Sequence, residues 1–378
     1  MKVLNVDVTI DPVAGGGCAE RTFQMTRTLA KYGVECSLLI LDIGLEVERI
    51  KALGDVNIHI LQCLNERFYI PKVSIQKLCE LVKNCDIVHL MGHWELTDAL
   101  IYPIIRHYDT PYVNCPAGSL KIQGRSRSIK YLYNLLIGNR IIRNASKLIA
   151  ISSNEFSQFK QYGAEAPDIV LIPNGINPDE YLTIDDKAFR ARNCLDDAPF
   201  VLFIGRLNSI KGPDLLLRAF IELKDDHPDY HLVFAGPDEG LKSEMERMIS
   251  DAKMSHRIHF TGFLFQEEKS MALNAANLLV IPSRSEAMSI VVLEAGAAST
   301  PVLATDQCGL NEIEEIGGGC IVPVSVKGLY DGLQKMLSQG NELKDMGKKL
   351  KSFVLANYTW DAMAGRLIEL YKSILMHD

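Results

Sequence analysis

Residues 277–305, NLLVIPSRSEAMSIVVLEAGAASTPVLAT, indicate the fold class. They begin with a short apolar run typical of a strand, pass through a polar loop into an apolar segment with helical spacing, and end with a second apolar run. The same alternation recurs along the chain, from KVLNVDV at 2–8 onward. Because strands that alternate with helices form parallel sheets covered on both faces, the sequence predicts an α/β protein.

The chain most naturally divides into two domains, because 378 residues exceed one ordinary core. A Pro/Asn/Gly cluster at 172–181 reads as the linker. Each half opens with a strand, a glycine-bearing loop and a helix, the first helix being expected over 19–32, which suggests two Rossmann-like units. We therefore predict domains at 1–175 and 176–356, followed by an amphipathic helix within 357–378 that begins after Thr359.

The composition excludes several classes of protein. Apolar residues make up 47% and charged residues 23%, which argues against disorder. A net charge of −7 argues against a general nucleic-acid binder, which needs a basic surface. The nine cysteines are scattered without a C-x-x-C pair, so we expect reduced, mostly buried thiols rather than zinc ligands or disulfides.

The predicted location is the cytoplasm. The start, MKVLNVDVTIDP, lacks the pattern of a signal peptide. No uninterrupted apolar run approaches the roughly 18 residues that span a bilayer.

Three glycines follow the first predicted strand and precede a helix: Gly15, Gly16 and Gly17. Their backbone can approach a ligand closely, and a helix start offers N–H groups to an anion. The pattern is not the dinucleotide motif G-x-G-x-x-G, because Glu20 occupies the last position. A tight turn without a ligand is the alternative.

The second half has two cations in the equivalent loop, Arg206 and Lys211. A planar guanidinium and a mobile ammonium together suit a diphosphate and can neutralise charge on a leaving phosphate. The spacing does not match the P-loop motif. The alternative is a pair of solvated surface cations.

Two glutamates eight positions apart are the most informative pair. Glu286 is expected in the loop at the carboxyl end of a strand, where open α/β sheets bind ligands. Glu294 is expected two turns inside an apolar helix capped by Ser289, where a buried carboxylate needs partners. Sugar hydroxyls could be those partners, and the amides of Ser289 and Ile290 would face the phosphates. Alternatively, Glu294 pairs with a nearby arginine and Glu286 caps a turn.

On these residues the chain resembles the retaining, nucleotide-sugar-dependent glycosyltransferases of family 4 (group 1). That family has the GT-B architecture, in which two facing Rossmann-like domains enclose an interdomain cleft. The resemblance covers nearly the whole chain, from the glycine loop to the closing helix. It is carried by GGG (15–17), IPNGIN (172–177), GRLNSIKG (205–212), SRSEAMSIVVLEAGAASTPVLAT (283–305) and CGLNEI (308–313).

The resemblance implies a role for each matched residue. Arg206 and Lys211 would hold the donor diphosphate, Glu286 would contact the transferred sugar, and Glu294 would bind the ribose. Gly16 and Gly17 would close over the phosphates from an acceptor-binding first domain, and the last helix would cross back to that domain. Family members usually need no bound metal, and this chain contains no D-x-D motif.

The chain departs from the family pattern in two places. Ala287, Met288 and Ser289 replace the glycine-containing E-G-F-G loop, and Ala117 stands where many relatives carry histidine or arginine. His93 is a further candidate on the acceptor side, although a histidine beside an aromatic residue is often simply packed. His89 and His93 have the spacing of a helical zinc pair, but Gly92 and the preceding strand indicate a loop.

The segment 121–147 is basic within an acidic protein and contains no acidic residue. Apolar residues interleaved with its cations suggest contact with an anionic membrane surface, where a lipid-linked acceptor would lie. The alternative is a core-packing helix with a solvated cationic edge. The cations are Lys121, Arg125, Arg127, Lys130, Arg140, Arg143 and Lys147.

The leading hypothesis is a hexosyltransferase that moves a sugar from a nucleoside diphosphate to a saccharide or lipid-linked acceptor, in cell-surface polysaccharide or glycolipid synthesis. A sugar-nucleotide epimerase of the same architecture and a non-catalytic sugar-binding module are the alternatives. A glycosidase fits poorly, because its two carboxylates must face each other across an open bond.

Overall fold

The computed structural model describes residues 1–122, 126–182 and 185–376, and the chain forms two compact units. The first unit contains Met1–Gly175 and the segment from Trp360 onward, and the second contains Ile176–Thr359. The closing helix begins at Trp360, directly after Thr359, where the sequence predicted its start.

The first unit is built on a parallel sheet with the strand order β3-β2-β1-β6-β7-β8-β9. Its strands are short apolar runs; all five residues of β6, for example, are buried. Val3 of β1 lies opposite Cys36 of β2 and Ile87 of β6, which fixes the register at the centre. The strands are β1 (Lys2–Val6), β2 (Glu35–Leu41), β3 (Asn57–Leu61), β6 (Ile87–Met91), β7 (Tyr112–Cys115), β8 (Lys147–Ala150) and β9 (Ile169–Leu171), with a separate antiparallel pair β4 (Cys63–Asn65) and β5 (Ile70–Pro71).

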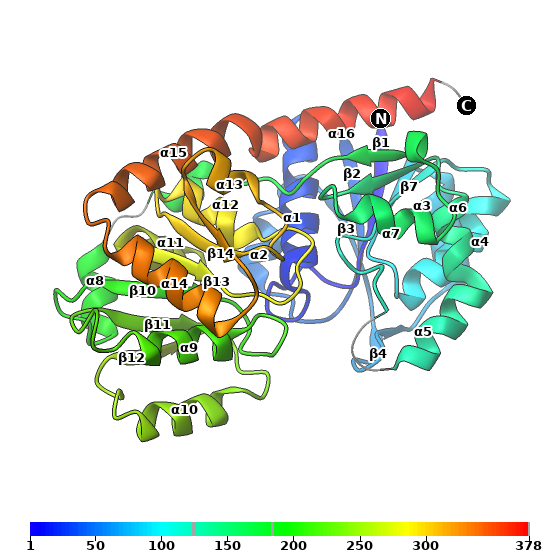
Figure 1. The fold of residues 1–378 in the computed structure, drawn as a ribbon. Helices are drawn as coiled ribbons and strands as arrows, with labels where there is room; N and C mark the ends of the chain where they lie inside the picture. Colours follow the sequence, from blue (N-terminus) through cyan, green and yellow to red (C-terminus); the bar gives the residue numbers. More distant parts are fainter. Residues whose placement is uncertain (123–125, 183–184, 377–378) are drawn as a thin grey trace. The chain divides into compact units, whose positions relative to one another are not determined.

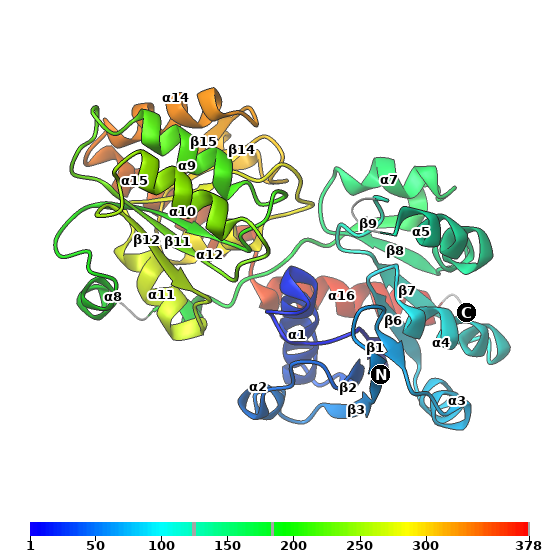
Figure 2. The same cartoon turned by 90° about the horizontal axis from the view of Figure 1, so that it is seen from below.

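Helices cover both faces of this sheet, as Figures 1 and 2 show. The closing helix packs on the first helix, so segments from the two ends of the chain share one face. The first helix begins at Gly16, three residues before the predicted start. The helices are α1 (Gly16–Lys31), α2 (Val47–Lys51), α3 (Ile75–Lys83), α4 (Leu96–His107), α5 (Arg127–Tyr133), the π-helical η1 (Asn134–Gly138), α6 (Asn139–Arg143), α7 (Glu155–Gln161), the 3-10 turn η2 (Ala166–Asp168) and α16 (Trp360–Leu375).

The second unit repeats this plan on a parallel sheet with the order β12-β11-β10-β13-β14-β15. Helices α9, α10 and α14 cover one face, and α11, α12 and α15 cover the other (Figure 2). The strands are β10 (Phe200–Ile204), β11 (His231–Ala235), β12 (Ile258–Gly262), β13 (Leu278–Ile281), β14 (Val302–Thr305) and β15 (Gly319–Val322). The helices are η3 (Pro178–Tyr181), α8 (Asp186–Arg192), α9 (Pro213–Glu222), α10 (Lys242–Asp251), α11 (Gln266–Ala275), α12 (Ile290–Ala297), α13 (Glu312–Glu315), α14 (Val326–Leu337) and α15 (Glu342–Asn357).

Both sheets therefore have the strand order of a Rossmann fold, and the predicted α/β class is confirmed. In each sheet the order reverses beside the first strand: between β1 and β6 in the first unit, and between β10 and β13 in the second. The loops that leave the carboxyl ends of these strands are where such folds bind ligands.

All nine cysteines are free thiols. Four are buried and Cys194 is exposed, while the others are partly covered. Within the part of the chain that the structure describes, none of the helices combines the length and the apolar character that a bilayer crossing needs.

Candidate functional site

Two loops of the second unit meet where its strand order reverses. One loop runs from β10 to α9 and the other from β13 to α12. Gly212 has φ +70°, and a Cβ added there would lie 2.1 Å from the carbonyl oxygen of Pro282. Only glycine therefore allows the loops to approach so closely. The amide of Arg284 donates to the carbonyl of Ile210 at 2.8 Å, and its guanidinium binds both carboxylate oxygens of Asp214 at 2.8 and 2.6 Å.

This contact brings Lys211 to Glu286. The Nζ of Lys211 lies 2.9 Å from Oε1 of Glu286, and the Ser283 hydroxyl donates to the same oxygen. The Glu286 side chain is only 8% exposed, whereas that of Lys211 is 26% exposed. The structure thus joins two predicted site residues that are 75 positions apart in the sequence.

Arg206 lies in the same loop but has a partner that the sequence reasoning missed. Its Nη1 lies 3.0 Å from Oε1 of Glu239, and the Asn208 side chain donates to the other oxygen of that carboxylate at 2.6 Å. Glu239 follows β11, in the loop beside the one that leaves β10. Its place after an apolar strand was the available signal. Arg206 and Lys211 are thus two ion-paired cations.

Glu294 is buried in the second turn of α12, as predicted. Its partner is Lys269 of α11, whose Nζ lies 2.6 Å from Oε1 of Glu294. The alternative prediction of an ion pair was close, but the cation is a lysine rather than an arginine. Nothing in the sequence around Lys269 marks it as this partner, because the pair depends on how α11 and α12 pack.

The start of α12 differs in one respect from the prediction. Ser289 is the N-cap residue, but its side chain accepts no capping hydrogen bond. Its backbone amide donates to the carbonyl of Cys308 at 3.1 Å, so this amide does not point freely toward a phosphate. Ile290 begins the helix, and amides of a first helical turn have no acceptor within the helix. The expected anion contact therefore falls to Ile290.

The loop that departs from the family pattern is held by the turn after β14. Gly309 has φ +75°, and a Cβ added there would lie 2.0 Å from the carbonyl oxygen of Ala287. The Met288 side chain is buried, and the Glu286 amide donates to the Gln307 carbonyl at 2.9 Å. The loop is therefore tightly packed where the resemblance implied flexible glycines.

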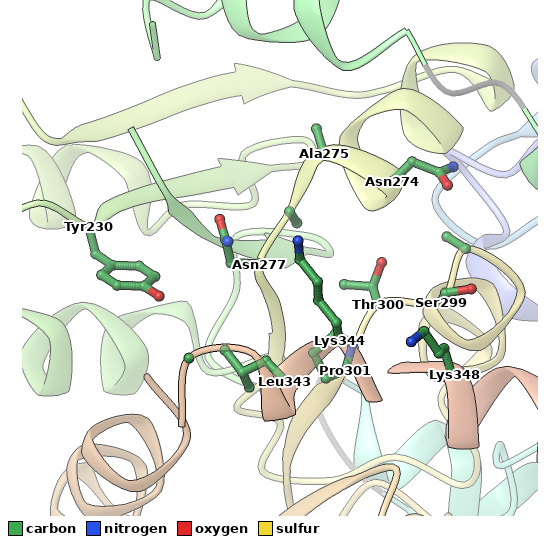
Figure 3. Close-up of a pocket in the computed structure, with 13 residues that line it drawn as sticks. Tyr230, Asn274, Ala275, Asn277, Ser299, Thr300, Pro301, Leu343, Lys344 and Lys348 are labelled. Atoms are coloured by element: carbon green, nitrogen blue, oxygen red, sulfur yellow. The ribbon is translucent and has the colours of Figure 1, made fainter. Parts of the chain in front are cut away.

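A pocket of about 380 Å³ lies at the opposite, amino-terminal edge of the same sheet. Asn277 and Pro301, which precede β13 and β14, line it, and Lys344 of α15 extends into it (Figure 3). None of the predicted site residues lines this pocket.

In the first unit, the predicted phosphate-binding glycines are part of α1. Gly16 and Gly17 are its first residues, and the Gly16 amide donates to the carbonyl of Pro12 at 3.1 Å. Gly16 has φ +59°, and a Cβ added there would meet nothing within 4 Å. The space over Gly16 is therefore open, but its amide is already used, which corrects the expectation of a free donor.

His93 lies in the loop after β6 and is a packed side chain. It is buried, its Nε2 lies 2.9 Å from Oδ1 of Asn134, and the rings of Trp94, Tyr133 and Tyr162 surround it. Burial lowers its pKa to about 4. The imidazole is therefore neutral near pH 7. Within the described ranges no group of three or more His, Cys, Asp and Glu side chains is placed to hold a metal ion.

Three carboxyl groups near the reversal of the first sheet were also missed; Asp7 and Asp98 are buried, and Glu95 is partly buried. Asp7 follows β1, and Glu95 and Asp98 lie at the start of α4. Burial raises the pKa of Asp7 to about 7 and lifts those of Glu95 and Asp98 well above their usual range, and repulsion from Asp7 raises the pKa values of both further. Asp7 interrupts an apolar strand in the sequence, which was the one available signal.

Within the basic segment 121–147, residues 127–143 form the helical stretch α5–η1–α6 and Lys147 begins β8, whereas Arg125 lies outside the described residues. Its apolar residues divide between the two sides. Ile141 and Ile142 are buried, as the alternative of a core-packing helix requires, whereas Leu132, Leu135 and Leu136 are exposed.

Comparisons with known proteins agree with this architecture. Residues 15–180 match the model of "Glycosyltransferase Family 4", and residues 185–372 match that of "Glycosyl transferases group 1". A D-inositol 3-phosphate glycosyltransferase of Streptomyces avermitilis is 33% identical over 71% of this chain and 57% of the relative. An uncharacterized glycosyltransferase of Methanocaldococcus jannaschii is 31% identical over 54% of each chain. This chain spans about half the length of the first such relatives.

Solved structures share the fold over the whole chain. Sucrose-phosphate synthase from Thermosynechococcus elongatus superimposes with a TM-score of 0.80 at 21% identity and covers 100% of both chains. The Anabaena protein HepE, solved with UDP-glucose, gives a TM-score of 0.80 at 18% identity, over 99% of this chain and 100% of that one. With two Rossmann-like units and family matches to both of them, the chain belongs to the group 1, family 4 glycosyltransferases of the GT-B fold.

Proposed function

We propose that the protein transfers a hexose-type sugar from a nucleoside diphosphate to a saccharide or lipid-linked acceptor, with retention at the anomeric carbon. The observation that carries this proposal is the pairing of Lys211 with Glu286 at the point where the strand order of the second unit reverses. A cation there suits a diphosphate, and a carboxylate beside it suits the hydroxyl groups of a sugar.

In the proposed reaction, the bond between the anomeric carbon and the diphosphate oxygen breaks, and a bond to the acceptor oxygen forms. The hydroxyl proton of the acceptor leaves with the diphosphate. Lys211, Arg206 and the first amides of α12 would stabilise the negative charge that builds on this leaving group. These fixed positive groups would supply the positive charge that a metal ion could otherwise supply, so the proposed transfer needs no metal ion.

The two glutamates would hold the two sugars of one donor. Glu286 would contact the transferred sugar, and Glu294, in the second turn of α12, would bind the ribose. Each carboxylate is ion-paired without a ligand, with Lys211 and Lys269 respectively. A donor would therefore share existing ion pairs, which hold both carboxylates in position before it binds. The HepE structure contains UDP-glucose, which supports a uridine nucleotide and a hexose as the first donor to test.

In the first unit, Gly16 and Gly17 stay candidates for contacts with the donor phosphates, and His93 stays the acceptor-side candidate. The neutral, packed His93 would act through shape or a hydrogen bond rather than through charge. The proposed setting is the inner face of a membrane, reached through residues 121–147, in the synthesis of a cell-surface polysaccharide or glycolipid.

The test begins with thermal unfolding against a panel of nucleoside diphosphates. Ligand at about 100 times its dissociation constant should add roughly 2.7 kcal/mol to the stability of the state that binds it. The diphosphate that shifts the unfolding temperature selects the donors for transfer assays, and NMR of the product reads the anomeric configuration. Inversion, or no shift with any diphosphate, would contradict the proposal.

The same assays separate the alternatives. An epimerase would change the sugar of the donor without any acceptor. A non-catalytic binding module would show the thermal shift but no turnover with any acceptor. Our proposal requires release of nucleoside diphosphate that rises with acceptor concentration.

A further inference from the structure

The segment α5–η1–α6 carries an outward face of large apolar side chains. Leu135 and Leu136 are 75% and 62% exposed, the former being among the most exposed large apolar residues described. Their spacing from Ile129 and Leu132, at three or four residues, is that of one helix face. Leaving such a cluster in water is unfavourable, and contiguous exposed apolar surface usually marks an interaction site. The outward set is Ile129, Tyr131, Leu132, Leu135 and Leu136.

The inner face of this segment is fixed, so the segment cannot roll to bury these leucines. Asn134 is buried, with its Oδ1 2.9 Å from Nε2 of His93, and its amide donates to the Tyr162 hydroxyl at 2.9 Å. The Tyr133 hydroxyl donates to the carbonyl of Glu95 at 3.2 Å. These contacts lie at the start of a π-helical turn, a feature often found at functional positions.

The surroundings of the apolar face are positively charged. No acidic residue lies between Asp109 and Glu155 in the sequence. Arg127 and Arg140 are exposed at the two ends of the segment, and neither forms an ion pair with any residue the structure describes. Exposed leucines flanked by unpaired arginines match a bilayer with anionic head groups, because the arginines meet the phosphates while the leucines enter the acyl boundary.

We propose that the surface formed by Ile129, Leu132, Leu135, Leu136, Arg127 and Arg140 inserts into an anionic lipid bilayer. This inference rests on the proposed function and specifies how the membrane is contacted: by insertion of leucines rather than by charge alone. The inner side of the same segment holds His93 and, through Tyr133, the backbone of Glu95. Insertion would thus bring the acceptor-side residues of the first unit close to the head group of a lipid-linked acceptor.

Vesicle flotation tests the insertion. The protein should float with vesicles of phosphatidylcholine containing 30–40% phosphatidylglycerol, about tenfold or more better than with phosphatidylcholine alone. The Leu135→Ser/Leu136→Ser variant should lose at least about tenfold of this binding. Arg127→Gln/Arg140→Gln should lose about fivefold for each cation, and the remaining binding should be less sensitive to salt.

The matched control is Val47→Ser/Ile75→Ser. These two residues are exposed apolar positions on α2 and α3 of the same unit, outside the proposed surface. This control should float like the wild type. Equal loss in the control, or wild-type flotation of the Leu135→Ser/Leu136→Ser variant, would overturn the proposal.

Insertion depth gives a second readout. A Leu136→Trp variant should show a blue-shifted emission with anionic vesicles and quenching by brominated acyl chains beyond that of the native Trp94 and Trp360. No added quenching would mean contact by charge alone and would overturn insertion. If the wild type is instead a dimer in sedimentation and the Leu135→Ser/Leu136→Ser variant a monomer, the face binds a second copy, and the proposal is wrong.

Nucleotide binding separates this inference from the proposed function. The candidate donor residues Arg206, Lys211, Glu286 and Glu294 lie in the second unit, and none of the variants above changes Gly16 or Gly17 of the first unit. Every variant should therefore keep the wild-type thermal shift with nucleoside diphosphate. A wild type that shifts with the diphosphate but does not float refutes only the membrane surface. If the wild type floats but shows no thermal shift with any nucleoside diphosphate, the membrane surface is supported and the donor site is refuted.

Discussion

Each predicted catalytic cation is paired with a carboxylate of the same unit. Lys211 pairs with Glu286, and Arg206 pairs with Glu239. An incoming diphosphate carries more negative charge than one carboxylate and offers several oxygens. Both cations could therefore bind the diphosphate while they keep their contacts with the glutamates. The Arg206 pair is the more exposed one and is worth little by itself, which makes it easy to exchange.

Replacing Lys211 by alanine should reduce turnover by about 100-fold or more, because one positive group that faces the leaving diphosphate is lost. Glu286→Gln should raise KM for the donor and lower kcat, while the fold survives. Steady-state kinetics with the donor found in the nucleotide screen checks both. The control is Lys327→Ala, which removes a surface lysine paired with Asp331 and should leave the kinetics unchanged. Near-normal kcat for Lys211→Ala would remove this residue from the mechanism.

Gly212 should tolerate no side chain, because its φ is +70° and a Cβ would meet the backbone of Pro282. Gly212→Ala should destabilise the second unit by about 3 kcal/mol or more and abolish the diphosphate-induced thermal shift. Gly340→Ala is the matched control, since φ is +55° there but nothing lies within 4 Å of the added Cβ. It should cost only about 1 kcal/mol. Denaturant unfolding followed by circular dichroism measures both, and equal losses would contradict the steric argument.

Among the elements, α12 connects stability to the candidate site. It packs on α11 and α15 and is apolar except for Glu294. The ion pair between Glu294 and Lys269 ties α12 to α11 in a largely buried setting. The carboxylate that is expected to bind the ribose is therefore also part of the packing of this unit.

Lys269→Met should destabilise the second unit by about 3–5 kcal/mol, because it leaves a buried carboxylate without its cation. Adding Glu294→Leu should recover most of that loss, since an apolar pair can replace a buried ion pair of similar volume. The double variant should nevertheless lose donor affinity. Denaturant unfolding of the wild type, both single variants and the double variant gives the coupling energy. A double variant less stable than Lys269→Met would contradict this account.

Sequence periodicity predicted most strands of the two sheets but few of the ion-pair partners. The apolar runs of β10, β13 and β14 were recognised, whereas β3, β9 and β15 were missed. β9 has three residues, β15 begins with glycine and cysteine, and β3 alternates with Asn57 and His59, so none forms a clear apolar run. Lys269 could not be predicted, because it meets Glu294 only after separate βα units have packed side by side. Glu239 follows an apolar strand, which was a signal for a site residue, but its pairing with Arg206 also depends on that packing.

On the scale of the whole molecule, the two units differ in how the chain builds them. The second unit is one continuous segment, whereas the first needs the returning helix α16. The hydroxyl of Tyr371 on α16 lies 2.6 Å from Nδ1 of His89 in the core of the first sheet. Arg21 of α1, also fully buried, donates to the carbonyls of Ile172 and Pro173 just before the crossing. The first unit therefore closes only when α16 has packed onto it.

The first unit also holds buried ionisable groups that make its stability depend on pH. An unfolded chain ionises its carboxyl groups near pH 4, but Asp7 keeps its proton in the folded unit up to its pKa of about 7, and Glu95 and Asp98 keep theirs well above the usual range. Between these limits the folded unit binds more protons, so its stability falls as pH rises. His89 and His93, whose pKa values are lowered to about 3 and 4, act in the opposite direction below about pH 6.5.

The first unit should therefore lose stability most steeply just above pH 6.5, where only the carboxyl groups still act. Asp98→Asn should lessen this loss, because the variant has one carboxyl group fewer that holds a proton in the folded unit. The effect on the free energy of unfolding should be up to about 1.4 kcal/mol per pH unit. Both oxygens of Asp98 are buried without a hydrogen-bond partner among the described residues, so the amide breaks no observed bond. Both tryptophans, Trp94 and Trp360, lie in the first unit, so their fluorescence follows its unfolding alone.

Denaturant unfolding of the wild type and Asp98→Asn at pH 5 and pH 8, read by tryptophan fluorescence, gives two differences in the free energy of unfolding. The difference at pH 8 should favour the variant more than the difference at pH 5. Asp55→Asn is the control, because this aspartate is exposed on the same unit and reports the effect of the substitution itself. If Asp98→Asn changes stability equally at both pH values, Asp98 does not hold a proton in the folded unit, and the pH dependence must come from other groups.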